Sequence, residues 1–297
     1  MEEVLDRFVI LMTYGIVLAV ILYFYRFAHL FLYPNGEKQY TRVFHPDKNK
    51  ADTLHYFGRM IGLCYILLAF EVHTLNNIIV DFIHILIWGV VSFLLYLLSL
   101  YICESILFYD FDYKTEIHKK ENFSFALISF SIACSLSIIL NQLIIESDSS
   151  FIILLILWLL CMVLFGVFSK LFKFYSSLNV IEDVHKQKLG APLIFSVFIV
   201  ALALIISVSL QQKHFELQSY MLRVVLKVLL SLTILPVFLK ALPKLFPAKN
   251  LTDSLRNEHG ETNLSQGIYE SGLLITATLL TLSVVFKINF ESLVNFY

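Results

Sequence analysis

Long apolar runs separated by polar connections are the main pattern along this chain. A bilayer core needs about 20 apolar residues in each helix that crosses it. Segments of this kind recur eight times, and none of them alternates with the two-residue period of a strand. We therefore predict an all-α membrane protein with about eight transmembrane helices, at residues 8–33, 54–75, 78–107, 122–145, 150–175, 188–211, 217–245 and 263–287.

A recurring spacing begins every second segment. In its clearest form an Asn is followed by small residues at +4, +9 and +13. Positions +9 and +13 lie one turn apart on one helical face, where small residues let neighbouring helices approach closely in lipid. The leading Asn suits a helix N-cap. The four copies are Asn263, Gly267, Gly272 and Thr276; Asn122, Ala126, Ser131 and Ser135; Asn49, Thr53, Gly58 and Gly62; and a degraded one at Gln187, Ala191, Ser196 and Val200.

The connections between the segments alternate in length. Longer polar connections follow the first, third, fifth and seventh segments, and short ones follow the others. Each copy of the spacing comes after a long connection, so the repeating unit is a pair of helices. The chain is therefore predicted to consist of four helical hairpins with the same orientation. These hairpins suggest a duplication into two tandem four-helix halves, residues 1–146 and 147–297.

Charge placement predicts the orientation. With 58% hydrophobic and 15% charged residues, the chain lacks the polar surface of a soluble domain. Cytoplasmic loops carry an excess of Lys and Arg, which places the long connections in the cytoplasm and both termini outside. The cations in or beside the long connections are Lys38, Arg42, Lys48, Lys50, Arg59, Lys114, Lys119, Lys120, Lys170, Lys173, Lys186, Lys188, Lys240, Lys244, Lys249 and Arg256.

Ionisable residues within the last two segments are the first candidate site. A carboxylate at the depth of Glu270 is costly unless it is paired, protonated or in contact with water. Lys240 is the expected partner, in either a structural ion pair or a polar pathway. Arg223 and Lys227 form a cationic stripe one turn apart on residues 217–245. Glu104 lies near the inner end of its segment, where we expect it to be hydrated.

A second candidate lies at the outer ends of residues 54–75 and 78–107. It comprises Glu71, His73, Asp81 and His84. Two imidazoles and two carboxylates could hold a divalent metal such as zinc, or relay protons. The alternative is a hydrated polar cluster at the membrane interface.

Signatures of soluble enzyme classes are absent from the sequence. It contains no HExxH, GxSxG, P-loop or dinucleotide-binding motif. We therefore expect no cofactor and assign no catalytic residue. The four cysteines lie in apolar runs without ligand spacing, which favours free thiols. The aromatic residues suit lipid contact, core and interfacial belts, and no basic aromatic groove indicates nucleic acid.

Two tracts carry a family resemblance. KKENFSFALISFSIACSLSIIL (119–140) and NEHGETNLSQGIYESGLLITATLL (257–280) resemble the motif region of the bacterial YjfL-like membrane proteins, grouped as domain of unknown function 350. The resemblance implies two tandem modules of about four helices in a multi-pass bacterial inner (plasma) membrane protein. The family has no established activity, and its members are associated with envelope stress.

Two functional hypotheses follow. The first is a channel or transporter-like protein for an ion or small solute, with Glu270 and Lys227 or Lys240 lining or gating the route. The second is a membrane scaffold that recruits a cytosolic protein partner through its basic loops in an envelope stress response. An enzyme acting on lipid, built on the Glu71, His73, Asp81 and His84 cluster, is a third alternative. The expected partners are the bilayer, a cytosolic protein and, in a homo-oligomer, further copies of the chain.

Overall fold

The computed structural model describes residues 2–32, 48–70, 78–107, 111–147, 150–176, 178–212, 216–245 and 263–288. Across these ranges the chain forms helices and no strand. Seven of the described helices are long and apolar enough, by length and composition, to cross a membrane. The chain is therefore a multi-pass membrane protein whose helices contact the lipid bilayer.

The long helices form two sets that alternate along the chain. The first set comprises α1 (Glu2–Leu32), α3 (Ile78–Leu107), α5 (Phe151–Ser169) and α9 (Leu217–Leu245). The second set, which we call the motif helices, comprises α2 (Lys50–Leu67), α4 (Phe123–Glu146), α8 (Gly190–Leu210) and α11 (Leu264–Val285). Three short helices lie in the described parts of the connections, and they are the π-helix η3 (Lys114–Lys119), α6 (Phe172–Tyr175) and α7 (Val180–His185).

The prediction of eight membrane-spanning helices exceeds what the described residues show. Seven helices meet the length and hydropathy of a span, and α2 is the long helix that does not. It has 18 residues and carries Lys50, Asp52 and Arg59, so its apolar length is short for a bilayer. Residues 71–77, where the predicted segment ends, lie outside the described ranges. The predicted segment 150–175 is also interrupted, because α5 ends at Ser169 and a turn precedes α6.

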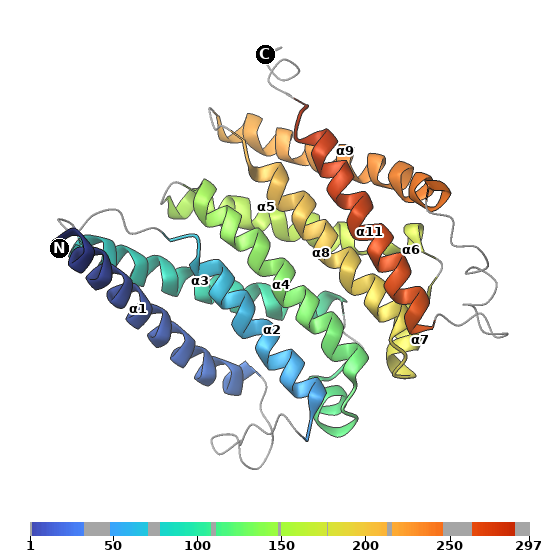
Figure 1. Ribbon diagram of the computed structural model, residues 1–297, viewed down its shortest axis with the longest axis horizontal. Helices are drawn as coiled ribbons and strands as arrows, with labels where there is room; N and C mark the ends of the chain where they lie inside the picture. The colour runs from blue at the N-terminus through green and yellow to red at the C-terminus, as the bar shows by residue number, and fades with distance from the viewer. Residues whose placement is uncertain are drawn as a thin grey trace.

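The motif helices lie side by side in one row (Figure 1). Their order is α2, α4, α8, α11, and each contacts the next. The other long helices form a second row, in which α1 contacts α3, α3 contacts α5, and α5 contacts α9. Each motif helix also contacts the long helix that precedes it in the chain. Because α4 and α8 have neighbours on both sides, they are the most deeply buried of the seven membrane-length helices.

Glycines bring the motif helices into close contact. A Cβ added at Gly58 would lie only 3.0 Å from the Phe130 Cα, and one at Gly62 would lie 3.0 Å from the Ala133 carbonyl oxygen. A Cβ at Gly267 would lie 2.8 Å from the Gly190 carbonyl oxygen. These contacts involve backbone atoms that cannot rotate away, so the predicted role of small residues in helix packing is confirmed here. Gly272 differs, since nothing lies within 4 Å of its added Cβ.

Asparagine side chains cap three of the four motif helices, as predicted. Asn49 accepts from the Asp52 amide at 2.9 Å, Asn122 from the Phe125 amide at 3.2 Å, and Asn263 from the Gln266 amide at 2.9 Å. The fourth copy behaves differently, because α8 starts at Gly190 with Leu189 at the N-cap position and no side-chain cap.

Gln187, the expected cap of α8, lies before this helix. It has a φ of 55°, and its side chain donates to the Lys120 carbonyl at 3.1 Å. Glutamine is not among the residues that favour the N-cap position. Its side chain therefore ties the connection before α8 to the residue that follows η3 instead.

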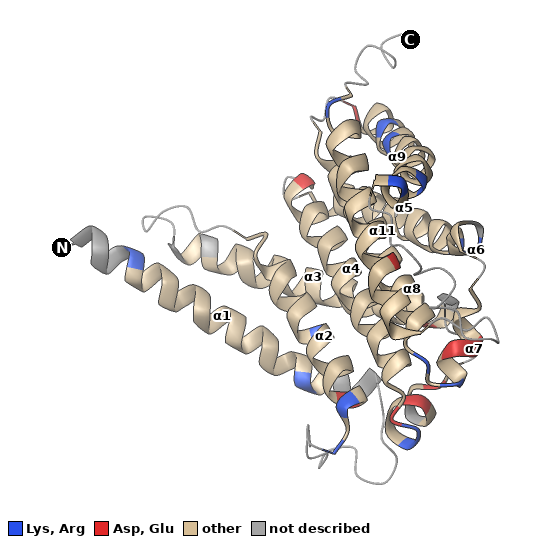
Figure 2. Ribbon diagram, turned by 45° about the vertical axis from the view of Figure 1, so that its right-hand side comes forward, with Lys and Arg blue, Asp and Glu red and all other residues tan. Residues whose placement is uncertain are grey.

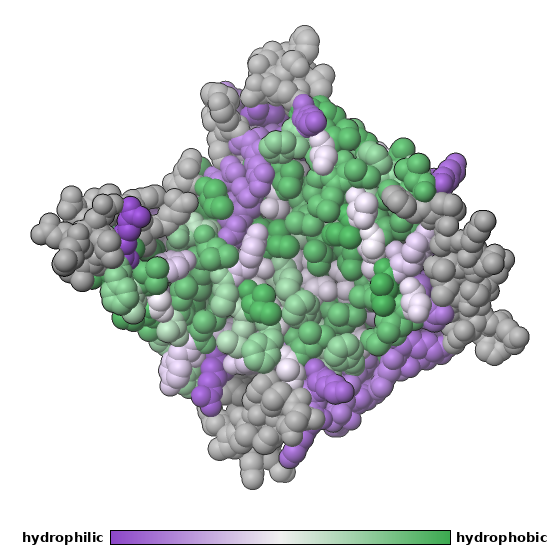
Figure 3. Space-filling model, in the orientation of Figure 1, coloured by the Kyte–Doolittle hydropathy of each residue, from purple (hydrophilic) through white to green (hydrophobic). Residues whose placement is uncertain are grey.

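The surface is apolar between two hydrophilic edges. Figure 3 shows hydrophilic residues along two opposite edges of the visible face, with hydrophobic residues between them. Figure 2 shows charged residues near η3 and α7, at the end of the molecule where α4 and α8 begin. Exposed hydrophobic side chains occur on every long helix outside the centre of the motif row, including Leu11, Ile79, Val163 and Val237. This distribution is typical of a protein surrounded by lipid.

Candidate functional sites

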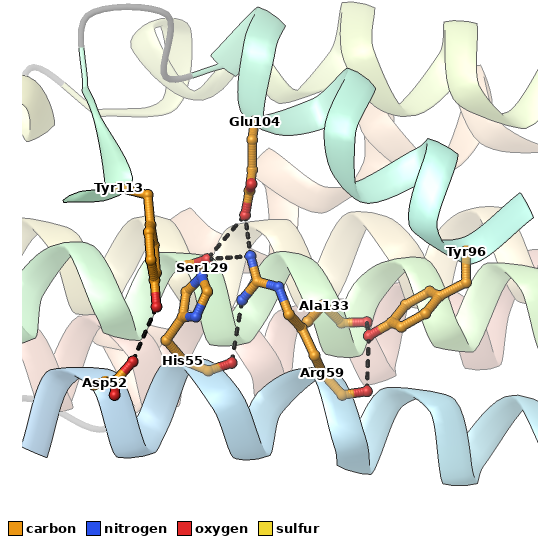
Figure 4. A network of polar contacts seen from close by, with 8 residues as sticks. All are labelled: Asp52, His55, Arg59, Tyr96, Glu104, Tyr113, Ser129 and Ala133. Atoms are coloured by element: carbon orange, nitrogen blue, oxygen red, sulfur yellow. Dashed lines mark hydrogen bonds and ion pairs between the residues drawn. The ribbon is translucent and has the colours of Figure 1, made fainter. Parts of the chain in front are cut away.

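A buried ion pair joins three helices in the first half of the chain (Figure 4). Arg59 of α2 is fully buried and forms an ion pair with Glu104 of α3. The same guanidinium nitrogen donates to Ser129 Oγ of α4 at 3.1 Å, and Ser129 Oγ donates to the Glu104 carboxylate at 3.2 Å. A second guanidinium nitrogen donates to the His55 carbonyl at 3.1 Å. One charge pair therefore connects α2, α3 and α4.

Aromatic side chains enclose this ion pair on both sides. The Tyr96 hydroxyl lies 3.3 Å from the Arg59 carbonyl oxygen and 3.4 Å from that of Ala133, so it bridges α2 and α4 next to Gly62. Towards the connection, the buried His55 ring lies 4.5 Å from the Tyr113 ring. The Tyr113 hydroxyl donates to the Asp52 carboxylate at 2.9 Å. Polar groups thus extend from η3 to the ion pair (Figure 4).

The sequence analysis missed this network, although the sequence contained a signal for it. We counted Arg59 as a cation beside a cytoplasmic connection and expected Glu104 to be hydrated. Arg59 nevertheless lies between Gly58 and Met60 inside an apolar run, where an unpaired charge is costly. Only 23% of the Glu104 side chain is exposed, and it is the partner of Arg59.

Two buried cations lie on α9. Arg223 is 6% exposed and Lys227 is 8% exposed, one turn apart on the same face. Arg223 Nε donates to the Ser219 carbonyl of its own helix at 3.3 Å. Among the described residues, no carboxylate forms an ion pair with either side chain. Both cations are therefore buried without a carboxylate in ion-pair contact in the part of the chain that the structure describes.

The expected pair of Glu270 and Lys240 is not formed. Glu270 is half-buried on α11, and its carboxylate accepts from Gln266 Nε2 at 2.7 Å. Lys240 is exposed on α9, and within the described part of the chain it forms no ion pair with Glu270. Glu270 can be held by a neutral amide because that amide lies one turn away on the same helix.

The proposed metal or proton site lies mostly outside the described residues. Glu71 and His73 belong to the undescribed range 71–77, and the side chain of Asp81 is not described either. His84 is exposed on α3, with its ring 6.0 Å from that of Trp88. Within the ranges that the structure describes, no group of three His, Cys, Asp or Glu side chains could hold a metal ion.

The connections before α4 and α8 are tied together by the capping residues. The Asn49 amide donates to the Ile117 carbonyl at 2.8 Å, and the Asn122 amide donates to the Val184 carbonyl at 2.8 Å. Ile117 and Val184 each lie five residues before the N-cap of the next motif helix. Asn49 and Asn122 therefore each hold both their own helix and the connection that leads to the next motif helix.

Charged residues in these connections form local ion pairs. Lys120 pairs with Glu116, and Lys186 pairs with Glu182, each at 2.7 Å. The hydrogen bond and charge of Lys186 lower the pKa of the Glu182 carboxyl from its ordinary value. Glu182 and Lys186 are both exposed, so this pair contributes little to stability. The surface here is mixed in charge, with exposed lysines beside acidic residues.

A comparison with protein families identifies two tandem copies of one domain. The family model described as Domain of Unknown Function (DUF350) matches residues 3–144 and again residues 147–285. The chain belongs to the DUF350 family. The first DUF350 copy contains α1 to α4, and the second contains α5 to α11. No curated protein and no solved structure shows a significant match.

Proposed function

We propose that this protein conducts an ion or small solute across the membrane, with the route in the second DUF350 copy. The observation that supports it is the burial of Arg223 and Lys227 on α9 without a carboxylate partner among the described residues. A cation in the low-dielectric interior is costly unless a counter-charge or water accompanies it. Buried cations of this kind favour an anion as the transported species.

Glu270 is the natural regulator of such a route. It lies on α11, which contacts α9, and it is half-buried, with the neutral amide of Gln266 as its hydrogen-bond partner among the described residues. When ionised, it opposes the entry of an anion, and when it is neutralised this opposition is lost. The sequence offered both Lys227 and Lys240 as residues that line the route. Lys240 is exposed, so we assign this role to Lys227, which is buried.

Flux measurements on purified protein in liposomes test this proposal. Lys227→Met should reduce anion flux at least about tenfold, because the change removes a buried cation and keeps an apolar side chain of similar length. Glu270→Gln should increase anion flux several-fold. Lys244→Met, which changes an exposed lysine on the same helix, should leave the flux unchanged. Absence of flux for all tested ions at several pH values would rule the proposal out.

The proposed architecture is two four-helix modules, residues 1–146 and 147–297, built from four like-oriented hairpins. In this arrangement the connections that carry η3 and α7 face the cytoplasm and both termini lie outside. Its support is the excess of Lys in the connections that precede the motif helices.

Site-directed labelling of intact cells tests the orientation. A cysteine at the exposed Lys119 or Lys186 should react with an impermeant thiol reagent only after the membrane is made permeable. A cysteine at Arg7, near the other end of the helices, should react without permeabilisation. Labelling of the Lys119 position in intact cells would contradict the proposed orientation.

A second candidate function is a scaffold for a cytosolic protein partner. Its support is the surface formed by η3 and α7, where Asn122 joins the two connections and exposed lysines lie beside acidic residues. Mixed-charge surfaces of this kind give electrostatic specificity to a protein contact. The double variant Lys119→Glu/Lys186→Glu should then abolish co-purification of the partner, whereas Lys227→Met should not affect it.

A further inference from the structure

The motif helices α2 and α4 present the same face to the motif helix that follows each of them in the row. On α2, Gly58 and Gly62 lie nine and thirteen residues after the capping Asn49, and they contact Phe130 and Ala133 of α4. On an α-helix these two positions share one face. The face at +9 and +13 is therefore the one that receives the next motif helix.

The same rule holds between α4 and α8. On α4, the residues at +2, +9, +13 and +20 from Asn122 are Ser124, Ser131, Ser135 and Gln142, and all four are buried. The hydroxyl of Ser124 donates to the Lys188 carbonyl at 2.7 Å, and Gln142 accepts from Gln211 at 3.0 Å. Both partners flank α8, so this face of α4 is directed to the next helix in the row.

The corresponding face of α11 has no neighbour in the described chain. At +2, +9, +13 and +20 from Asn263 stand Ser265, Gly272, Thr276 and Ser283, all small and all exposed. Nothing lies within 4 Å of a Cβ added at Gly272. The opposite side of α11 is occupied, because Gly267 at +4 contacts Gly190 of α8. The row therefore ends with an open receiving face.

The capping Asn of α11 differs from the other two in the contacts that its side-chain amide makes with described residues. The side-chain amides of Asn49 and Asn122 each donate to a carbonyl in the connection that leads to the next motif helix. Asn263 caps α11 with its oxygen, but its amide donates to no group among the described residues. A next helix in the row would supply such a carbonyl.

At the other end of the row, α2 presents an exposed face that matches this receiving face. The residue of α4 that packs on Gly58 is Phe130, eight residues after Asn122. Its equivalent on α2 is Phe57, eight residues after Asn49, and 43% of it is exposed. Ile61, Cys64 and Leu68 continue this exposed apolar stripe along α2.

We propose that a second copy of this chain packs α2, with Phe57, against the Gly272 and Thr276 face of α11. The contact repeats between two copies the interface that α2 and α4 form within one copy. In lipid, close approach at small residues stabilises such helix pairs through dispersion contacts. The interface joins two different faces, so it is heterologous, and successive copies form a closed ring or an open row.

Bulky substitution at Gly272 tests the interface without disturbing the fold. Gly272→Leu should convert the oligomer into a monomer, because a large side chain separates α11 from the incoming α2, while no described residue lies within 4 Å of its Cβ. Gly166→Leu is the matched control, since Gly166 of α5 also has nothing within 4 Å of its added Cβ. The stoichiometry is read from single-molecule photobleaching in nanodiscs. A monomeric wild type, or an oligomer that persists in Gly272→Leu, would overturn the proposal.

Cysteine cross-linking in native membranes identifies the partner. An added Cβ at Gly58 lies 3.2 Å from the Phe130 Cβ, which is close to disulfide distance, so the equivalent positions Gly272 and Phe57 of two copies should cross-link. The test uses Gly272→Cys and Phe57→Cys, each with Cys64→Ser.

Mixing the two single variants should give a disulfide-linked dimer, and the double variant should give a ladder of higher species. Neither single variant should cross-link alone through a heterologous contact. Cross-linking of a single variant to itself, to a different protein, or not at all in the mixture would each reject a second copy in this position.

Discussion

The two DUF350 copies differ at positions where the first copy holds its ion pair. Ser129 lies seven residues after Asn122 and completes the network of Arg59 and Glu104. The corresponding residue after Asn263 is Glu270, so the second copy has a carboxylate where the first has a hydroxyl. Arg59 lies ten residues after its N-cap, and the equivalent residue of α8 is the fully buried Ile199.

The two copies therefore place their charged residues differently within the same family domain. In the first copy, charges of opposite sign neutralise each other among α2, α3 and α4, which fixes the relative positions of these helices. In the second copy the buried cations are on α9, the carboxylate is on α11, and the described residues show no ion pair between them. Neutralised charge contributes to a rigid structure, whereas unneutralised charge remains available to a ligand.

The largest expected difference between the copies is in stability after loss of a charge. Arg59→Met leaves the Glu104 carboxylate without its partner and should lower the free energy of unfolding by about 3–5 kcal/mol. Arg59→Met/Glu104→Leu should recover most of that loss, because no charge then remains buried. The measurement is unfolding by denaturing detergent in mixed micelles. Equal losses in the single and double variants would show that packing, and not charge, dominates at this site.

Glycine substitutions should lower the unfolding free energy more in the interior of the row of motif helices than at its end. Gly62→Leu should cost about 1–3 kcal/mol of unfolding free energy or prevent folding, because its side chain would meet Tyr96 and the Ala133 backbone. Gly272→Leu should change the stability of the monomer by less than about 0.5 kcal/mol. The same unfolding assay on both variants, in detergent at low protein concentration, checks this contrast. Similar losses would contradict it.

Transfer of the arginine should show whether the second copy can form the pair of the first. Ile199→Arg places a guanidinium on α8, which contacts α11, where Glu270 occupies the Ser129 position. We expect Ile199→Arg to be less destabilising with Glu270 present than in a Glu270→Gln background, by about 1 kcal/mol. A double-mutant cycle of unfolding free energies gives this coupling. A coupling of zero would show that the two copies differ in backbone geometry as well as in charge.

Loss of a capping Asn should give the smallest difference in unfolding free energy between the two copies. Asn263→Ala removes one cap and should cost about 1 kcal/mol. Asn122→Ala also removes the hydrogen bonds to Glu116 and to the Val184 carbonyl, and should cost about 1 kcal/mol more. Unfolding measurements on both variants test this order. If Asn263→Ala were the more damaging variant in the monomer, the amide of Asn263 would have a partner within its own chain.

Helix positions and packing faces could be read from the sequence to a large extent. The predicted boundaries at 78–107 and 217–245 coincide with α3 and α9, and the Asn spacing identified three of the four N-caps. These features are local, since apolar length and capping depend on neighbouring residues and on the surrounding lipid. Local signals failed where they were weak, as in the register of Gln187 and the membrane length of α2.

The order of residues alone is enough to predict a membrane protein with a doubled domain and a repeated packing face. Which charges meet depends on the packing of the helices: Arg59 pairs with Glu104, whereas Lys240 does not pair with Glu270. This packing also decides that the Gly272 face is open while the equivalent Gly58 face is filled. Depth along a helix can be counted from residue number, but the direction in which a side chain points depends on how neighbouring helices are rotated and spaced, and distant parts of the chain fix that rotation.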